Sequence, residues 1–213
     1  MVVIVAGFVG AAWGFVADRI AARWPAHEDG STRAIDWRTP LVAVVGAVAF
    51  AATALRFGGD PIAVLAIGIY VVALVLLFAT DIDQRLLPDV ITLPLIVFAG
   101  VVLVAGQSVF IRTSEDVLWA VAAAILVPAG LFLLSIPFGQ GAIGQGDLKL
   151  LVSVGLLVGA MKLVYALIVG ALLAGLTVGT LLLLRRISLK SFVPYGPFLI
   201  AGILWAILAL PQP

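Results

Sequence analysis

The longest apolar run of the chain is LKLLVSVGLLVGAMKLVYALIVGALLAGLTVGTLLLL, residues 148–184. One membrane crossing needs about 20 mostly apolar residues, so this run is too long for one helix and suits two. Gly155, Gly159 and Lys162 interrupt its middle and predict a break near Ala160. The run therefore predicts two consecutive membrane helices, of which the first is the shorter.

Six further stretches have the length and composition of single membrane crossings. Together with the divided run they predict an all-α fold, a polytopic membrane helix bundle of about eight transmembrane helices in which the sixth is the shortest. We divide the chain into an N-terminal helix pair with its loop, residues 1–60, and a second helix bundle, residues 61–213. The six stretches are 2–17, 41–57, 62–80, 90–106, 116–136 and 192–210.

The composition excludes several classes of protein. Hydrophobic residues make up 64% of the chain and charged residues 11%, and the mean hydropathy is +1.28. A soluble domain carries about 25% charged residues, so we expect the lipid bilayer to cover most of this surface. A net charge of +1 gives no electrostatic basis for binding nucleic acid. The chain has no cysteine, and its single histidine is His27, which excludes thiolate catalysis and a zinc site built from Cys or several His.

The basic residues predict how the chain crosses the membrane, because Lys and Arg gather on the cytoplasmic side. Residues 1–16 are apolar from the first residue and lack the basic region of a cleavable signal peptide, so we expect a retained helix. Placing the N-terminus outside puts nine basic residues at cytoplasmic ends and three outside. The cytoplasmic segments are then 18–40, 81–89, 137–147 and 185–191. The nine are Arg19, Arg23, Arg33, Arg38, Arg85, Lys149, Arg185, Arg186 and Lys190, and the three are Arg56, Arg112 and Lys162.

Asp81 closes the third apolar stretch, where a carboxylate needs an explanation. An anion at the C-terminal end of a helix meets an unfavourable dipole, and Lys or Arg normally stands there. A carboxylate at the hydrocarbon boundary is costly unless it is hydrated or paired, so it is a candidate for function. We expect Asp81 to have a functional role. Asp83 reads as a solvated loop residue that pairs with Arg85.

Asp89 has two readings of equal weight. Pro88 fits the start of the next helix, because proline has no backbone N–H to donate. Asp89 then lies in the first helical turn, where the dipole favours an anion. The position of Asp89 is therefore explained by helix geometry alone, and a supporting role at a site remains open beside it.

Asp147 follows a glycine-rich stretch, residues 139–146, which contains Gly144 and Gly146. Glycine lets a backbone approach a ligand closely. A glycine-rich loop before a helix can also hold phosphate, but the Asp147 charge argues against an anion here. The alternative is a flexible connector in which Asp147 caps the next helix. From composition alone the two readings have equal weight.

The predicted topology places Asp81 and Asp147 at the same depth on the same side of the bilayer. Two carboxylates that share one site cannot both ionise cheaply, so they hold one proton between them. Such a pair can activate water with one group and protonate a leaving amine with the other. This chemistry needs no metal and no cofactor, which fits the composition.

Two motifs resemble those of the type IV prepilin peptidases, membrane aspartyl proteases of the GxGD type. The pattern Asp, six residues, Pro-Asp runs from Asp81 to Asp89, and the pattern Gly-x-Gly-Asp-x-Lys runs from Gly144 to Lys149. The catalytic aspartates of the family map onto Asp81 and Asp147. The resemblance gives Gly144, Gly146, Asp89 and Lys149 substrate-binding or supporting roles.

The resemblance covers nearly the full length of the chain. Residues 14–25, GFVADRIAARWP, are similar to the family's Gly-Ser-Phe-Leu-Asn opening, with Asp18 where Asn is usual. Residues 193–198, VPYGPF, are similar to its Pro-Phe-Gly-Pro segment. Many bifunctional members carry two Cys-x-x-Cys pairs in the first cytoplasmic loop. Residues 18–40 have none, and the loop is shorter.

The resemblance implies an endopeptidase of the bacterial inner membrane, with its active site facing the cytoplasm. Its substrates would be prepilins or pseudopilins of type IV pili or protein secretion, cut after Gly. Proteolysis would need no cofactor. Methylation of the new N-terminus from S-adenosylmethionine stays open. The alternative is a proton- or cation-coupled transporter that uses intramembrane carboxylates. The chain shows no internal repeat, and both aspartates lie at helix ends, which favours the peptidase.

Overall fold

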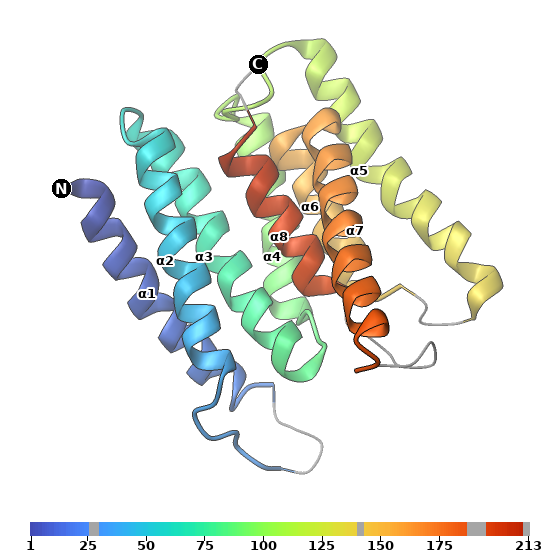
Figure 1. The fold of residues 1–213 in the computed structure, drawn as a ribbon. Coiled ribbons are helices and arrows are strands. Elements are labelled where there is room, and N and C mark those ends of the chain that lie inside the picture. The colour runs from blue at the N-terminus through green and yellow to red at the C-terminus, as the bar shows by residue number, and fades with distance from the viewer. Residues whose placement is uncertain (26–29, 140–142, 187–194, 211–213) are drawn as a thin grey trace.

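The chain folds into a bundle of helices (Figure 1). The structure is a computed structural model, and it describes all residues except 26–29, 140–142, 187–194 and 211–213. The described residues contain eight α-helices and one 3-10 turn and no strand, which confirms the all-α prediction. The helices are α1 (Val2–Ala21), α2 (Arg38–Phe57), α3 (Pro61–Gln84), α4 (Asp89–Val104), α5 (Ser114–Ser135), α6 (Gln145–Val158), α7 (Ala160–Leu183) and α8 (Gly196–Leu208), and the turn η1 is Ile136–Phe138.

Five of these helices, α1, α2, α3, α5 and α7, are long and apolar enough to cross a membrane. The break predicted near Ala160 is present, since α6 ends at Val158 and α7 begins at Ala160. Gly159 between them has a φ of +83°, a backbone conformation that residues other than glycine rarely adopt. The expectation that the sixth helix is the shortest is wrong by one residue, because α6 has 14 residues and α8 has 13.

The predicted ends of three helices, α1, α2 and α3, are wrong, and all three lie at the same end of the bundle. Helix α1 continues to Ala21 and α2 begins at Arg38, so the connection between them is residues 22–37 and not 18–40. Helix α3 continues past Asp81 to Gln84 and ends at Arg85, whose backbone is left-handed. Asp81 and Asp83 therefore both lie in the last turn of α3. The polar residues at these helix ends predict loops when read from sequence alone. In the folded chain, partners from other segments stabilise the same residues in helical conformation.

Helix α3 lies at the centre of the bundle (Figure 1). Its buried face packs with side chains of α6 and α8, and the hydroxyls of Tyr70 and Ser153 share a hydrogen bond of 2.7 Å between α3 and α6. A buried hydrogen bond between two spans ties them together, because few competing partners exist inside a membrane bundle. The chain therefore carries Asp81 on a helix with many buried residues.

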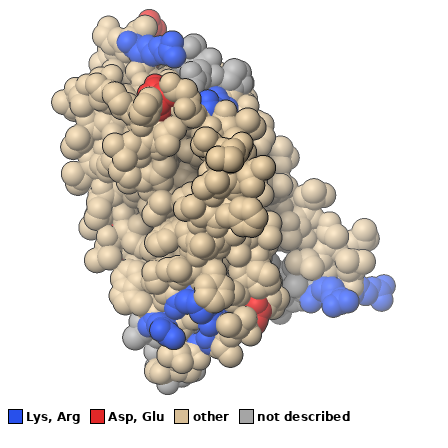
Figure 2. Space-filling view, turned by 90° about the vertical axis from the view of Figure 1, so that its left-hand side faces the viewer, with Lys and Arg blue, Asp and Glu red and all other residues tan. Residues whose placement is uncertain are grey.

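Charged groups lie mostly at the two ends of the bundle, with a broad apolar belt between them (Figure 2). Large apolar side chains of α5 and α7 are exposed on this belt, among them Ile125, Leu126, Leu172 and Leu176. Such a surface is stable only against lipid, which agrees with the composition. We call the end that carries Arg19, Arg33 and Arg38 the arginine-rich end.

Lys162 and Arg56 lie at the other end of the bundle, where both side chains donate hydrogen bonds to carbonyl oxygens at the C-terminal end of α8. The Lys162 ammonium donates to the carbonyl oxygens of Ala206, at 3.4 Å, and Leu210, at 3.2 Å, and Arg56 also donates to Leu210. The last carbonyls of a helix have no partner within the helix, and basic side chains satisfy them. Lys162 therefore has a structural role there.

Candidate active site

Asp81 lies in the last turn of α3, at the arginine-rich end. The residue is 5% exposed, and its Oδ2 is buried with no hydrogen-bond partner among the described residues. Its backbone carbonyl accepts the N–H of Arg85 at 2.9 Å, which closes the helix. A buried carboxylate oxygen without a hydrogen-bond partner lowers the stability of the fold. Its presence at this position therefore indicates a functional role.

Asp147 lies in the first turn of α6, whose start is at the same end of the bundle. The N-cap is Gly144, so the reading of Asp147 as the N-cap is wrong. The Asp147 carboxylate instead accepts the backbone N–H of Gly144, and its Oδ1 is buried with no partner among the described residues. A carboxylate three positions into a helix satisfies the N-cap N–H and meets a favourable dipole. The helix start therefore orients Asp147.

The two carboxylates come from different helices and share one electrostatic environment. The Asp81 and Asp147 charges interact. Tyr195, just before α8, lies close enough to Asp147 for the two groups to interact electrostatically. The topology derived from sequence placed both aspartates on one side of the membrane, and the structure brings them to one site.

Gly196 at the start of α8 packs directly against Asp81. A Cβ atom at this position would lie 2.5 Å from Asp81 Oδ2 and 2.6 Å from its Cγ. Real Cβ atoms do not approach other atoms so closely, so any residue other than glycine would force Asp81 or the start of α8 to shift. Sequence reasoning found this segment by resemblance but assigned no residue of it to the site. Its first two residues, Val193 and Pro194, lie outside the described residues.

The glycines before Asp147 meet the chain itself. A Cβ atom on Gly146 would lie 2.6 Å from the Cβ of Leu87, in the connection between α3 and α4, and one on Gly144 would lie 2.9 Å from Asp147 Oδ2. These contacts favour a supporting role for both glycines, because they let α6 begin close to the end of α3. A contact of either glycine with substrate stays a prediction.

Asp89, in the first turn of α4, forms an ion pair with Lys149, near the start of α6. The Lys149 Nζ lies 2.6 Å from Asp89 Oδ1, and the side chains are 30% and 58% exposed. An ion pair so open to solvent contributes at most about 1 kcal/mol. Lys149 therefore pairs with Asp89.

A comparison with known families gives this geometry a context. The sequence profile of the Type IV leader peptidase family matches residues 68–210, more than half of the chain and both aspartates. The chain belongs to this family.

Curated relatives of the family agree with the match. The chain is 36% identical over 167 residues to the "Prepilin leader peptidase/N-methyltransferase" of Burkholderia pseudomallei, 31% over 184 residues to that of Aeromonas hydrophila and 32% over 171 residues to that of Dickeya chrysanthemi. These alignments cover 78 to 83% of this chain but only 52 to 61% of the relatives, so the chain spans little more than half their length. No solved structure matches the chain significantly.

One prediction for a residue close to Asp81 was wrong. Asp83 is not a solvated loop residue: its side chain is 1% exposed and forms ion pairs with Arg33 and Arg38. These partners stand 50 and 45 positions earlier in the chain, so no local pattern could have predicted them. In the described parts of the chain, no three His, Cys, Asp or Glu residues gather as a metal site would require.

Proposed function

We propose that this leader peptidase family member is an aspartyl endopeptidase that removes the leader peptide from type IV prepilins or pseudopilins, after Gly. The observation that carries the proposal is the pair Asp81 and Asp147. The two carboxylates come from different helices to one end of the bundle, and each keeps one buried oxygen without a partner in the described residues. Those free oxygens are what water and a peptide bond would need.

The chemistry follows from two carboxylates that share one proton. The ionised group takes a proton from water, and the resulting hydroxide attacks the carbonyl carbon of the peptide bond. The protonated group gives its proton to the leaving amide nitrogen as the C–N bond breaks. The products are a new carboxyl end on the leader and a free amine on the pilin. The two groups exchange protonation states in each turnover.

The membrane side of the site is part of the proposal. The arginine-rich end holds the connection 22–37, Asp81 and Asp147, and basic residues favour the cytoplasm. We place this end in the cytoplasm and the N-terminus outside, in the bacterial inner membrane. The apolar helix of a pilin precursor would lie in the lipid beside the bundle, with its Gly at the height of the site. This arrangement explains why a peptidase would be built from membrane helices.

Reconstitution tests the proposal. The purified protein in liposomes is mixed with a prepilin that carries Gly before the cleavage point, and the products are analysed by mass spectrometry. We expect a shortened pilin whose first residue is the one that follows Gly. An intact precursor, or a cut elsewhere, contradicts the proposal.

Removal of metal should leave the rate unchanged. Carboxylates and water suffice for the proposed chemistry, so cleavage in strong chelator should stay within about twofold of the untreated rate. The measurement is the initial rate after dialysis against chelator. Loss of cleavage that a single metal ion restores would instead indicate a carboxylate-ligated metal enzyme.

The relatives' names also include N-methyltransferase, which raises the question of whether this chain uses S-adenosylmethionine as a methyl donor. Among the described charged groups near the connection 22–37, Asp18 pairs with Arg19 and Arg33, and Asp36 pairs with Arg33. Groups already neutralised in this way do not fit a site for a charged cofactor.

We therefore expect cleavage without methylation of the pilin. With S-adenosylmethionine supplied, the mature pilin should keep the mass of an unmodified N-terminus. The same mass spectrum that identifies the cut decides the question, and the precursor treated with a bifunctional relative is the control. One extra methyl group on most molecules would show that the cysteine-free connection is sufficient for methyl transfer.

A further inference from the structure

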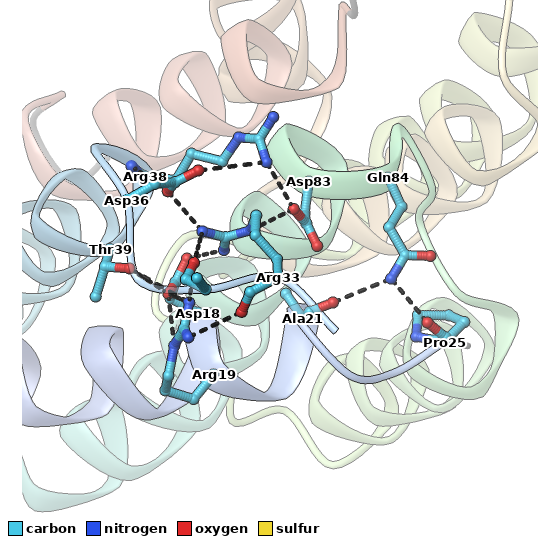
Figure 3. A network of polar contacts seen from close by, with 11 residues as sticks. Asp18, Arg19, Ala21, Pro25, Arg33, Asp36, Arg38, Thr39, Asp83 and Gln84 are labelled. Carbon is cyan, nitrogen blue, oxygen red and sulfur yellow. Dashed lines mark hydrogen bonds and ion pairs between the residues drawn. The ribbon is translucent and has the colours of Figure 1, made fainter. Parts of the chain in front are cut away.

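Six charged side chains form one network at the arginine-rich end (Figure 3). We call it the arginine network. It joins α1, α2 and α3 to the connection 22–37 and contains three guanidinium groups and three carboxylates, so its charges cancel. Its members are Asp18, Arg19, Arg33, Asp36, Arg38 and Asp83.

Arg33 is the centre of the arginine network. Its Nε lies 2.6 Å from Asp83 Oδ1, its Nη1 lies 2.6 Å from Asp36 Oδ1, and its Nη2 contacts Asp18 Oδ1. Burial lowers the pKa of this guanidinium, but the hydrogen bond and charges of its carboxylate partners outweigh burial and raise it. The planar guanidinium holds three carboxylates in fixed directions, as a lysine could not.

Two of the carboxylates are almost fully buried. The side chains of Asp18 and Asp83 are each 1% exposed. Asp18 also accepts the Thr39 hydroxyl at 2.7 Å, and Asp83 lies 2.9 Å from Arg38 Nη1. A buried carboxylate is costly unless it is paired, so these contacts stabilise Asp18 and Asp83 in their buried positions. The network thus has one anchor on α1, at Asp18, and one on α3, at Asp83.

The α3 anchor, Asp83, lies in the same helical turn as Asp81. A second tie reinforces it, because the Gln84 amide donates to the carbonyl oxygens of Ala21 at 3.0 Å and Pro25 at 2.7 Å. Asp81 Oδ2 itself has no hydrogen-bond partner among the described residues. The position of the Asp81 carboxylate therefore depends mainly on the backbone of this last turn of α3.

We propose that Arg33 and Arg38 are positioning residues of the peptidase: by holding Asp83 they fix the last turn of α3 and so place Asp81 opposite Asp147. This inference rests on the proposed function. Neither arginine touches the reacting atoms. Both act through Asp83 and the helix backbone, since only Ile82 separates Asp83 from Asp81.

The two anchors of the network make the inference testable. Loss of either anchor leaves a charge imbalance and should lower the unfolding temperature. Only loss of the α3 anchor should also move Asp81, and a displacement of about 1 Å can lower a rate about 100-fold. A role in stability alone would give both losses the same effect on catalysis.

The experiment measures kcat, KM and the unfolding temperature of the full chain in liposomes with a prepilin. We expect Asp83→Asn to lower kcat by about tenfold to 100-fold with KM within about twofold, since substrate binding does not involve this group. Asp83→Glu, which keeps the charge, should recover part of kcat. Asp18→Asn is the matched control, and its kcat should stay within about threefold of the wild type despite a lower unfolding temperature.

Arg38→Gln provides a second variant, because Arg38 is 28% exposed and its loss leaves Arg33 on Asp83. Its kcat should fall by at least about threefold in folded protein, also when Asp83→Asn fails to fold. A wild-type kcat in either folded variant overturns the inference, as does an equal fall of kcat in Asp18→Asn. Wild-type protein that cuts no prepilin contradicts the proposed function instead.

Discussion

Replacement of Asp81 or Asp147 by Asn should lower the rate of prepilin cleavage by about 1,000-fold or more, with the protein still inserted and folded. An amide can neither take a proton from water nor share one with its partner. The substitution removes no volume. The buried oxygens Asp81 Oδ2 and Asp147 Oδ1 have no partner in the described residues that an amide would lose, so folding should be spared.

The rates are measured with purified variants in liposomes at equal protein concentration. Asp89→Asn and Lys149→Gln are the matched controls, because they alter charges on α4 and α6 at the same end in an exposed pair. Both should keep rates within about threefold of the wild type. A near wild-type rate for either Asp81→Asn or Asp147→Asn would show that the pair is not catalytic.

The substitution Gly196→Ala should lower kcat by about 100-fold. The new Cβ would lie 2.5 Å from Asp81 Oδ2, where no real Cβ fits, so the carboxylate or the start of α8 must move. Either movement separates Asp81 from its position opposite Asp147. The effect should appear in kcat, since the substitution adds one methyl group behind the carboxylate and removes no contact with substrate.

Gly68→Ala is the control for this substitution, because it lies on the same helix as Asp81 and a Cβ there meets no atom within 4 Å. It should keep the wild-type rate and unfold at the same or a slightly higher temperature. The measurement is steady-state cleavage together with thermal unfolding of both variants. Equal rates for Gly196→Ala and Gly68→Ala would show that the contact with Asp81 has no catalytic consequence.

Apolar length predicted most of the fold. Apolar runs near 20 residues predicted the helices, because a helix that crosses a lipid bilayer must be apolar over that length. Gly159 marked the break between α6 and α7. The same reasoning placed Asp81 and Asp147 at one end of the bundle. Successive helices cross the membrane in opposite directions, so the third helix ends on the side where the sixth begins. The pairing of these two residues was therefore accessible without a structure.

Contacts between distant segments could not be predicted. Asp83 looked like a loop residue because its partners, Arg33 and Arg38, belong to another part of the chain. Their charges extend α3 by a turn beyond the apolar run, an effect of tertiary pairing that no local pattern encodes. Gly196 was missed for the same reason, because its meaning comes from a carboxylate on α3.

The central claim is that Asp81 and Asp147 act as one catalytic unit. Single-turnover cleavage of a prepilin by Asp81→Asn, Asp147→Asn and the double variant tests it most directly. Groups that act as a unit show strongly non-additive losses. We predict that the double variant is no slower than the slower single variant. Losses that multiply in the double variant would contradict a shared-proton pair, and so would a single variant that retains most of the wild-type rate.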